Sequence, residues 1–196
     1  MEKLTSLNLS FDRVLMQLVL PGAIAAFPFL SLYFDRQPDV YKVLTQDSIT
    51  YLVTFCLFIS LLVGFGIEGI GSRLEVFRFD KCLKTKFPEF NSTWEKYLQL
   101  SYKNEPIGQR YLRNIVFRMK LELSMALSLI CLNLGMICYE RYYTVFFDKL
   151  LNISILHIIP AFASIYLYQE AWASAKVLHN TRKLLVDKYY PLIDET

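Results

Sequence analysis

Long runs of apolar residues, separated by short polar segments, dominate the first half of the chain. The run from Val14 to Phe34 contains no charged residue, and neither does the run from Thr50 to Ile67. A helix needs about 20 mostly apolar residues to cross about 30 Å of hydrocarbon. We therefore predict transmembrane helices over residues 14–34 and 50–69.

Two similar runs occur in the second half. Leu123 to Tyr139 and Leu150 to Gln169 are free of charge, and charged residues flank each of them. They predict two more spans, over residues 121–143 and 149–170. The expected fold class is thus all-α, a four-transmembrane-helix integral membrane protein that forms a single membrane domain over residues 1–196.

The segment over residues 70–120, between the second and third spans, is too long to be a simple connector. Its stretch Leu74–Asp80 alternates apolar and charged residues, and we favour an interfacial extension of the second span over a strand. Ser92 to Glu95 matches the S-x-x-E capping box and predicts a short helix to about Lys103. Pro106 then begins a pattern that stays helical to Tyr143. We expect a helical insert.

The distribution of Lys and Arg predicts how the spans are oriented. If both termini are cytoplasmic, the two tails and the insert hold 17 of the 21 Lys and Arg residues. Positively charged loops stay on the cytoplasmic side of a membrane. We therefore expect a multi-pass protein of the cell inner membrane, with cytoplasmic N and C termini and a cytoplasmic tail over residues 171–196.

Composition supports a membrane protein and argues against an enzyme. The hydrophobic fraction is 54% and the aromatic fraction 15%, both high for a soluble domain. The cysteines form no C-x-x-C pair and have no nearby histidine, so we expect reduced thiols, no metal site and no other cofactor. These cysteines are Cys56, Cys82, Cys131 and Cys138. With only His157 and His179 and no catalytic motif, we predict no catalytic residues.

The segment Gly64–Gly69 matches G-x-G-x-x-G, a dinucleotide-binding pattern. That pattern needs a short strand before it, whereas here a membrane-length apolar run precedes it. Ser60 and Gly64 instead predict a close contact between helices, with Gly66, Gly69 and Gly71 loosening the chain that follows.

Small or weakly polar residues recur along one face of the third predicted span, and they suggest two roles. They permit close helix packing, or they line a pore or water-filled crevice in an oligomer. The fourth span carries an ionisable His157 before Pro160, for which a structural hydrogen bond and a functional role are equally open. The candidate residues for a pore or for helix packing are Ser124, Ser128, Cys131, Gly135, Cys138 and His157.

The insert mixes basic and aromatic side chains, which suggests a binding surface. Anionic lipid is the simplest partner of such a segment, and docking of a cytoplasmic protein is the functional alternative. Direct nucleic-acid binding is disfavoured because acidic residues share the stretch. The partner-binding candidates are Trp94, Arg110, Tyr111, Arg113 and Arg118.

The layout from Val14 to Lys188, with its insert around Glu75, Trp94 and Arg110, resembles the small four-span membrane proteins of prokaryotic antiviral defence systems, such as the Kiwa membrane subunit and the type VI-B CRISPR accessory. That resemblance implies a homo-oligomer in the inner membrane that senses membrane disturbance and signals to a cytoplasmic partner, or that permeabilises the membrane. A non-enzymatic sensor or anchor is the leading expectation. An oligomeric pore comes second, and a small transporter or membrane enzyme third.

Overall fold

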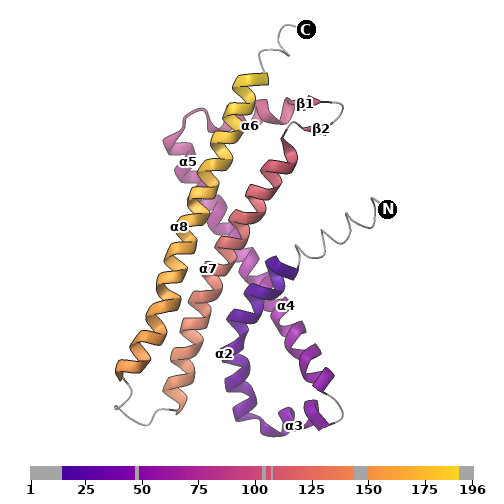
Figure 1. Ribbon diagram of the computed structural model, residues 1–196, viewed down its shortest axis with the longest axis vertical. Coiled ribbons are helices and arrows are strands. Elements are labelled where there is room, and N and C mark those ends of the chain that lie inside the picture. Colours follow the sequence, from indigo (N-terminus) through magenta and orange to yellow (C-terminus); the bar gives the residue numbers. More distant parts are fainter. Residues whose placement is uncertain (1–14, 47–48, 103–104, 107, 144–149, 190–196) are drawn as a thin grey trace. The chain divides into compact units, whose positions relative to one another are not determined.

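The computed structural model describes residues 15–46, 49–102, 105–106, 108–143 and 150–189, and these are helical apart from one short strand pair and the connecting turns (Figure 1). The two strands pair in antiparallel register, with Tyr102 opposite Glu105. In chain order the elements are the π-helical segment η1 (Leu15–Val19), α2 (Leu20–Arg36), α3 (Pro38–Gln46), α4 (Ile49–Leu74), the π-helical segment η2 (Glu75–Asp80), α5 (Lys81–Lys86), α6 (Phe90–Gln99), β1 (Ser101–Tyr102), β2 (Glu105–Pro106), α7 (Gln109–Tyr143) and α8 (Leu150–Tyr189).

Three helical stretches among the described residues are long and apolar enough to cross a membrane: Leu15–Arg36, Ile49–Lys86 and Tyr111–Arg141. They cover the first three predicted spans except for Val14, which lies outside the described residues, and for Tyr142 and Tyr143, which belong to α7 but lie beyond the third stretch. The fourth predicted span lies in α8, except for residue 149, which falls outside the described residues. The three stretches indicate a membrane protein, and α8 is not among them.

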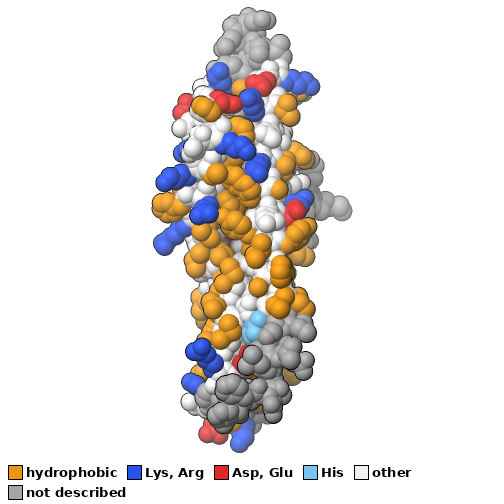
Figure 2. Space-filling model, turned by 90° about the vertical axis from the view of Figure 1, so that its left-hand side faces the viewer, with side chains coloured by type: hydrophobic (Ala, Val, Ile, Leu, Met, Phe, Trp, Pro, Cys, Tyr) orange, Lys and Arg blue, Asp and Glu red, His pale blue; other side chains and the backbone are white. Residues whose placement is uncertain are grey.

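The exposed side chains of α4 agree with this assignment. Leu57, Phe58, Leu62 and Phe65 are each more than half exposed. Hydrophobic side chains also cover much of the face drawn in Figure 2. A lipid environment provides the apolar surroundings that such side chains require.

Contacts within the chain divide it into two compact units. Unit 1 comprises Met1–Gly71 and Leu123–Tyr168, and unit 2 comprises Ser72–Glu122 and Gln169–Thr196. Helices α4, α7 and α8 contribute residues to both units. Unit 2 thus takes in most of the predicted insert together with the predicted tail.

Unit 1 is held together by close helix contacts at small residues. A Cβ atom on Gly22 of α2 would lie 1.8 Å from the carbonyl oxygen of Ser60 in α4, and one on Gly64 would lie 2.0 Å from that of Leu18. Only glycine permits backbones to approach this closely. Ser60 and Gly64 therefore lie at a close helix contact, as their spacing predicts, whereas Gly66 and Gly71 do not interrupt α4.

Unit 2 has its own hydrophobic core. Tyr97, Leu100, Leu112, Leu178 and Val186 form a buried cluster contributed by α6, the residue that follows it, α7 and α8. Full burial of one such large apolar side chain stabilises a fold by about 1.5–3 kcal/mol. The core therefore fixes α6 against the two long helices.

Several local predictions for the connecting segments are wrong. The predicted capping box is not formed, because the Ser92 hydroxyl donates to the carbonyl oxygen of Glu89, and α6 already begins at Phe90. Helix α6 ends at Gln99 instead of continuing to about Lys103, since the chain then enters the β1–β2 pair.

Helix α7 (Gln109–Tyr143) begins later than Pro106 predicts. Gly108 adopts φ 73°, a left-handed conformation that favours glycine, and its carbonyl oxygen accepts from the amide of Leu112. Helix α7 therefore begins at Gln109. The first predicted loop also contains a helix, α3, which the sequence did not indicate.

Candidate functional site

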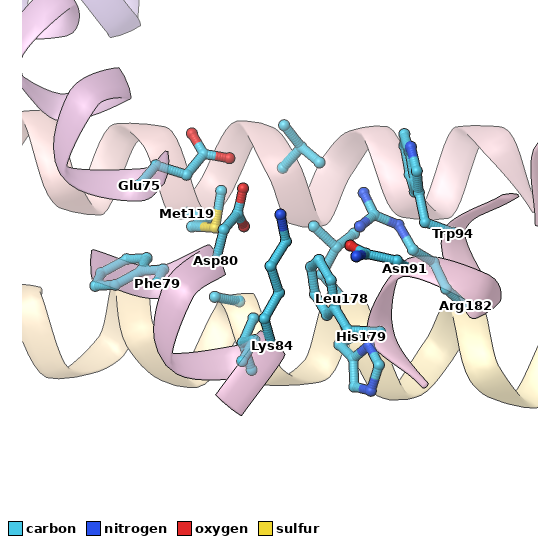
Figure 3. A pocket seen from close by; sticks show the side chains of 14 residues that line it. Glu75, Phe79, Asp80, Lys84, Asn91, Trp94, Met119, Leu178, His179 and Arg182 are labelled. Carbon is cyan, nitrogen blue, oxygen red and sulfur yellow. The ribbon is translucent and has the colours of Figure 1, made fainter. Parts of the chain in front are cut away.

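Unit 2 contains a cavity of about 500 Å³ built from five of its elements. Figure 3 shows the side chains that line it. The lining side chains come from η2, α5, α6, α7 and α8. The lining residues are Glu75, Phe79, Asp80, Leu83, Lys84, Phe90, Asn91, Trp94, Val116, Met119, Ala175, Leu178, His179 and Arg182. This volume falls within the usual range of small-molecule sites, about 300–1,000 Å³.

Local helix geometry explains why charged groups gather at this cavity. Asp80 and Lys84 are four residues apart across the junction of η2 and α5, so they share one helix face. Phe79, one residue earlier, is buried and packs on Trp172 of α8 with ring centroids 5.2 Å apart. The buried aromatic contact anchors the segment and leaves its charged face on the cavity.

The cavity has an acidic end and a basic, aromatic end. In Figure 3 the carboxylates of Glu75 and Asp80 lie toward one end, Arg182 lies beside Trp94 toward the other, and the Lys84 ammonium lies between them. Within the described part of the chain, none of these four charged side chains has an ion-pair partner within 4.0 Å. The opposite charges of the cavity therefore form no direct ion pair, although Lys84 and Arg182 act electrostatically on Asp80, and Lys120 and Arg182 act on Glu75.

Arg182 is the most unusual of these groups. Its guanidinium carbon lies 4.1 Å from the centre of the Trp94 ring, and its Nε is buried without a hydrogen-bond partner among the described residues. A cation over an indole ring gains about 0.5–2 kcal/mol. Leaving a buried donor without a partner costs about 1–3 kcal/mol. Burial accordingly lowers the pKa of Arg182, while Tyr97 and the carboxylates of Asp80 and Glu75 oppose that shift.

His179 is a second buried polar group beside the cavity. Its ring stacks on Phe90, with centroids 5.2 Å apart, and lies 4.6 Å from the Phe87 ring. Its Nε2 is buried and has no hydrogen-bond partner among the described residues. Burial lowers the pKa of His179, and the nearby Glu89 carboxylate only partly opposes this shift. The neutral imidazole is therefore the form that the fold favours near neutral pH.

Outside the cavity, Lys183 pairs with Glu89 at 2.8 Å. The hydrogen bond from Lys183 lowers the pKa of Glu89, and the same bond raises the pKa of Lys183. Lys183 and Arg182 are adjacent in α8, yet the first is neutralised and the second is not. This contrast makes the pair a matched comparison for experiments.

No family model, curated protein or solved structure matches this chain. The chemistry of the site is therefore argued from its own residues. Among the described residues, no group of three or more His, Cys, Asp or Glu side chains is placed to hold a metal ion.

The partner-binding candidates in unit 2 fall into different environments. Trp94 lines the cavity beneath Arg182. Tyr111 is 58% exposed, and Arg113 is also exposed on α7. The side chain of Arg110 lies outside the described residues. Trp94 is also 39% exposed, but it is engaged with Arg182, so of the residues named here Tyr111 and Arg113 are the ones exposed away from the cavity lining.

Arg118 forms ion pairs inside unit 2. Its Nε lies 2.6 Å from Glu122, and its Nη2 lies 3.1 Å from Glu170 of α8. The other carboxylate oxygen of Glu122 accepts from the Ser174 hydroxyl at 2.9 Å. Arg118 thus links α7 to α8.

The small-residue face of α7 packs inside unit 1. Ser124 and Ser128 are buried, and the Ser128 hydroxyl donates to the carbonyl oxygen of Ser124. A Cβ on Gly135 would lie 2.4 Å from the Pro28 side chain in α2. Cys131 is half-buried and Cys138 is exposed. Within the protomer, most of this face therefore contacts neighbouring helices.

His157 links α8 to α7 through both ring nitrogens. Its Nδ1 bonds to Asn133 Oδ1, and its Nε2 lies 2.9 Å from Glu140 Oε2. The Asn133 amide nitrogen donates to the His157 carbonyl oxygen at 3.1 Å, which fixes the amide oxygen toward the ring. Both ring nitrogens of His157 therefore have a polar partner on α7.

The sequence did not indicate the cavity. Its four charged residues come from positions 75 to 84 and from position 182, and no motif joins them. The one available signal is the spacing of Leu178 and Arg182, which places an arginine on the same face of a helix as a core residue.

Proposed function

We propose that this chain is a non-enzymatic, multi-pass membrane sensor that receives a ligand in the cavity of unit 2 and transmits its presence to a cytoplasmic protein. The observation that supports this role is the cavity, in which a stacked, half-buried Arg182 has no ion-pair partner among the described residues. Unneutralised charge in a cavity costs free energy, and a complementary ligand removes that cost.

Helix continuity supports transmission from the cavity to the rest of the chain. Helices α7 and α8 both line the cavity and both contribute to unit 1. A change in the spacing of these helices at the cavity therefore acts on continuous helical segments. The ion pairs of Arg118 and the His157 hydrogen bonds are the polar links that such a change would have to alter.

The proposed partner surface is the exposed part of α7 around Tyr111 and Arg113. Exposed aromatic and arginine side chains are enriched at protein interfaces. The resemblance to antiviral defence proteins adds the proposal that the chain acts as a homo-oligomer in the inner membrane, with cytoplasmic termini and with defence as its context.

The test is to purify the tagged protein from native membranes in mild detergent and to determine the mass and composition of the complex. The variants are Arg113→Glu and, as a matched control on the same helix in unit 1, Arg141→Glu, which is also exposed. We expect a stoichiometric cytoplasmic protein with the parent chain and with Arg141→Glu, and its loss with Arg113→Glu. A pure homo-oligomer in all three preparations would refute the sensor role and favour an autonomous pore.

A further inference from the structure

The charge pattern of the cavity indicates what kind of ligand fits it. A purely anionic ligand would meet Arg182 and Lys84 but would also face Glu75 and Asp80 at the other end. A purely cationic ligand would face the reverse conflict. Only a ligand with an anionic group and a cationic group satisfies both ends, because each charge then lies against its opposite.

The basic end suits a phosphate. A guanidinium held flat on an indole ring still offers its edge for two parallel hydrogen bonds to phosphate oxygens. The Arg182 guanidinium carbon lies 4.1 Å from the centre of the Trp94 ring, and Asn91, also on α6, lines the same end in Figure 3. Lys84 adds a second positive charge. These groups match a phosphate with several acceptor oxygens.

The acidic end suits a primary ammonium. Two carboxylates, from Glu75 and Asp80, accept hydrogen bonds and cannot donate them when ionised. A primary ammonium supplies three N–H donors, whereas a quaternary ammonium supplies none. The acidic end therefore distinguishes ethanolamine-type from choline-type groups.

The rest of the lining is apolar. Phe79, Met119 and Leu178 line the cavity together with the charged groups, and Phe79 and Met119 are almost completely buried. Glu75 follows directly on α4, one of the helices long enough to cross a membrane. Apolar walls next to a charged cavity suit a molecule with both a polar and an apolar part.

We propose that the cavity of unit 2 binds an aminophosphate zwitterion, a primary ammonium joined by a short carbon chain to a phosphate, as in phosphatidylethanolamine or free phosphoethanolamine. The inference rests on the proposed role of the cavity as the receiving site. Arg182 and Lys84 hold the phosphate, and Glu75 and Asp80 hold the ammonium.

The first measurement is thermal unfolding of the full-length protein in detergent, with phosphoethanolamine, phosphocholine or inorganic phosphate added. We expect phosphoethanolamine at saturating concentration to raise Tm by at least about 3 °C and phosphocholine to give less than half of that rise. Equal shifts with both compounds would overturn the assignment of the acidic end. If neither the free compounds nor any lipid raises Tm, the proposal is overturned.

The lipid source is tested by mass spectrometry of the purified protein after exchange into micelles that contain phosphatidylethanolamine, phosphatidylcholine and phosphatidylglycerol. Selective retention of phosphatidylethanolamine assigns the ligand to the membrane. Retention of no lipid, together with a shift by free phosphoethanolamine, assigns it to a soluble source. Preferential retention of phosphatidylglycerol would refute a zwitterion site, because that lipid has no ammonium.

Variants separate the two ends of the cavity. Arg182→Gln should weaken phosphoethanolamine binding at least about tenfold, and Lys183→Gln, the adjacent matched control outside the cavity, should leave it unchanged. The double variant Glu75→Gln and Asp80→Asn should abolish the preference for ethanolamine over choline. If Arg182→Gln does not fold, Arg182→Lys keeps the charge but loses the bidentate edge and should still bind more weakly.

These binding measurements use the purified protein without its partner. A chain that binds no aminophosphate but still binds the cytoplasmic protein through Arg113 would overturn this ligand class and leave the proposed function standing. A chain that binds phosphoethanolamine with the expected selectivity but has no protein partner would overturn the proposed function and leave the ligand class standing.

Discussion

The glycine contacts of unit 1 allow a prediction in which similar substitutions have opposite effects. Gly22→Ala and Gly64→Ala each add one methyl group where a backbone carbonyl already lies 1.8 or 2.0 Å from the new atom. Gly66→Ala adds the same group in the same helix as Gly64, at a position with nothing within 4 Å. The two substitutions in α4 therefore differ only in what the methyl group meets.

The structure gives the size of the effect. Cβ atoms essentially never approach another heavy atom closer than 3.0 Å, so the helices must separate by about 1 Å at Gly22 or Gly64. Overpacking of this kind costs about 1–3 kcal/mol. For a chain of this length each kcal/mol shifts Tm by about 2–4 °C, so we expect a fall of about 2–12 °C. Gly66→Ala should instead gain up to about 1 kcal/mol from helix propensity.

The assay is thermal unfolding of the purified variants in one detergent, with the same lipid content. The predicted result is a lower Tm for Gly22→Ala and Gly64→Ala and an equal or higher Tm for Gly66→Ala. If Gly64→Ala and Gly66→Ala shift Tm in the same direction and by similar amounts, the close contact between α2 and α4 is not present in the folded protein.

Three further predictions concern polar groups. His179→Gln should reduce the fall in Tm between pH 7.5 and pH 5.5. The pKa of His179 is lowered in the folded protein, so the stability that the neutral imidazole contributes is lost as pH falls through the unfolded pKa of about 6.5. An unchanged dependence of Tm on pH would contradict this prediction. Asn133→Leu should destabilise the protein by about 1–3 kcal/mol in denaturant titrations, since it leaves His157 Nδ1 and its carbonyl oxygen without their partner, and no measurable change would argue against the bond. Glu122→Gln should cost about 1 kcal/mol or less, because its partner Arg118 is largely exposed; a loss above about 3 kcal/mol would show that the link is effectively buried.

The length of the charge-free apolar runs was the most reliable predictor in this sequence. Charge-free runs such as Val14–Phe34 and Thr50–Ile67 report burial in lipid directly, since a single charge within them would be costly. The contact at Ser60 and Gly64 was also predictable, because small residues four apart on an apolar helix have few other uses.

Short-range signals in the polar segments were less reliable. Ser92 fits a capping box in sequence, but its hydroxyl bonds to Glu89 because α6 begins earlier. The strand pair after α6 has no pattern of its own, since two residues are too few to show a period. Boundaries that depend on packing against α7 and α8 were therefore mislocated.

The cavity itself could not be predicted. Arg182 acquires its character from Trp94, which is 88 residues away in the chain, and from a core that brings α6 against α8. Arg182 and Lys183 are adjacent basic residues in the sequence, and only the fold places the first over Trp94 in the cavity and the second beside the Glu89 carboxylate. Long-range juxtaposition of this kind leaves no local trace.

The central claim is that the state of the unit 2 cavity controls a cytoplasmic partner. The most direct test is the composition of the complex purified from native membranes with the parent chain, Arg182→Gln and Lys183→Gln. We predict that Arg182→Gln changes the amount of bound partner at least severalfold and that Lys183→Gln leaves it unchanged. The same amount of partner with all three chains, or no partner with any of them, would contradict the claim.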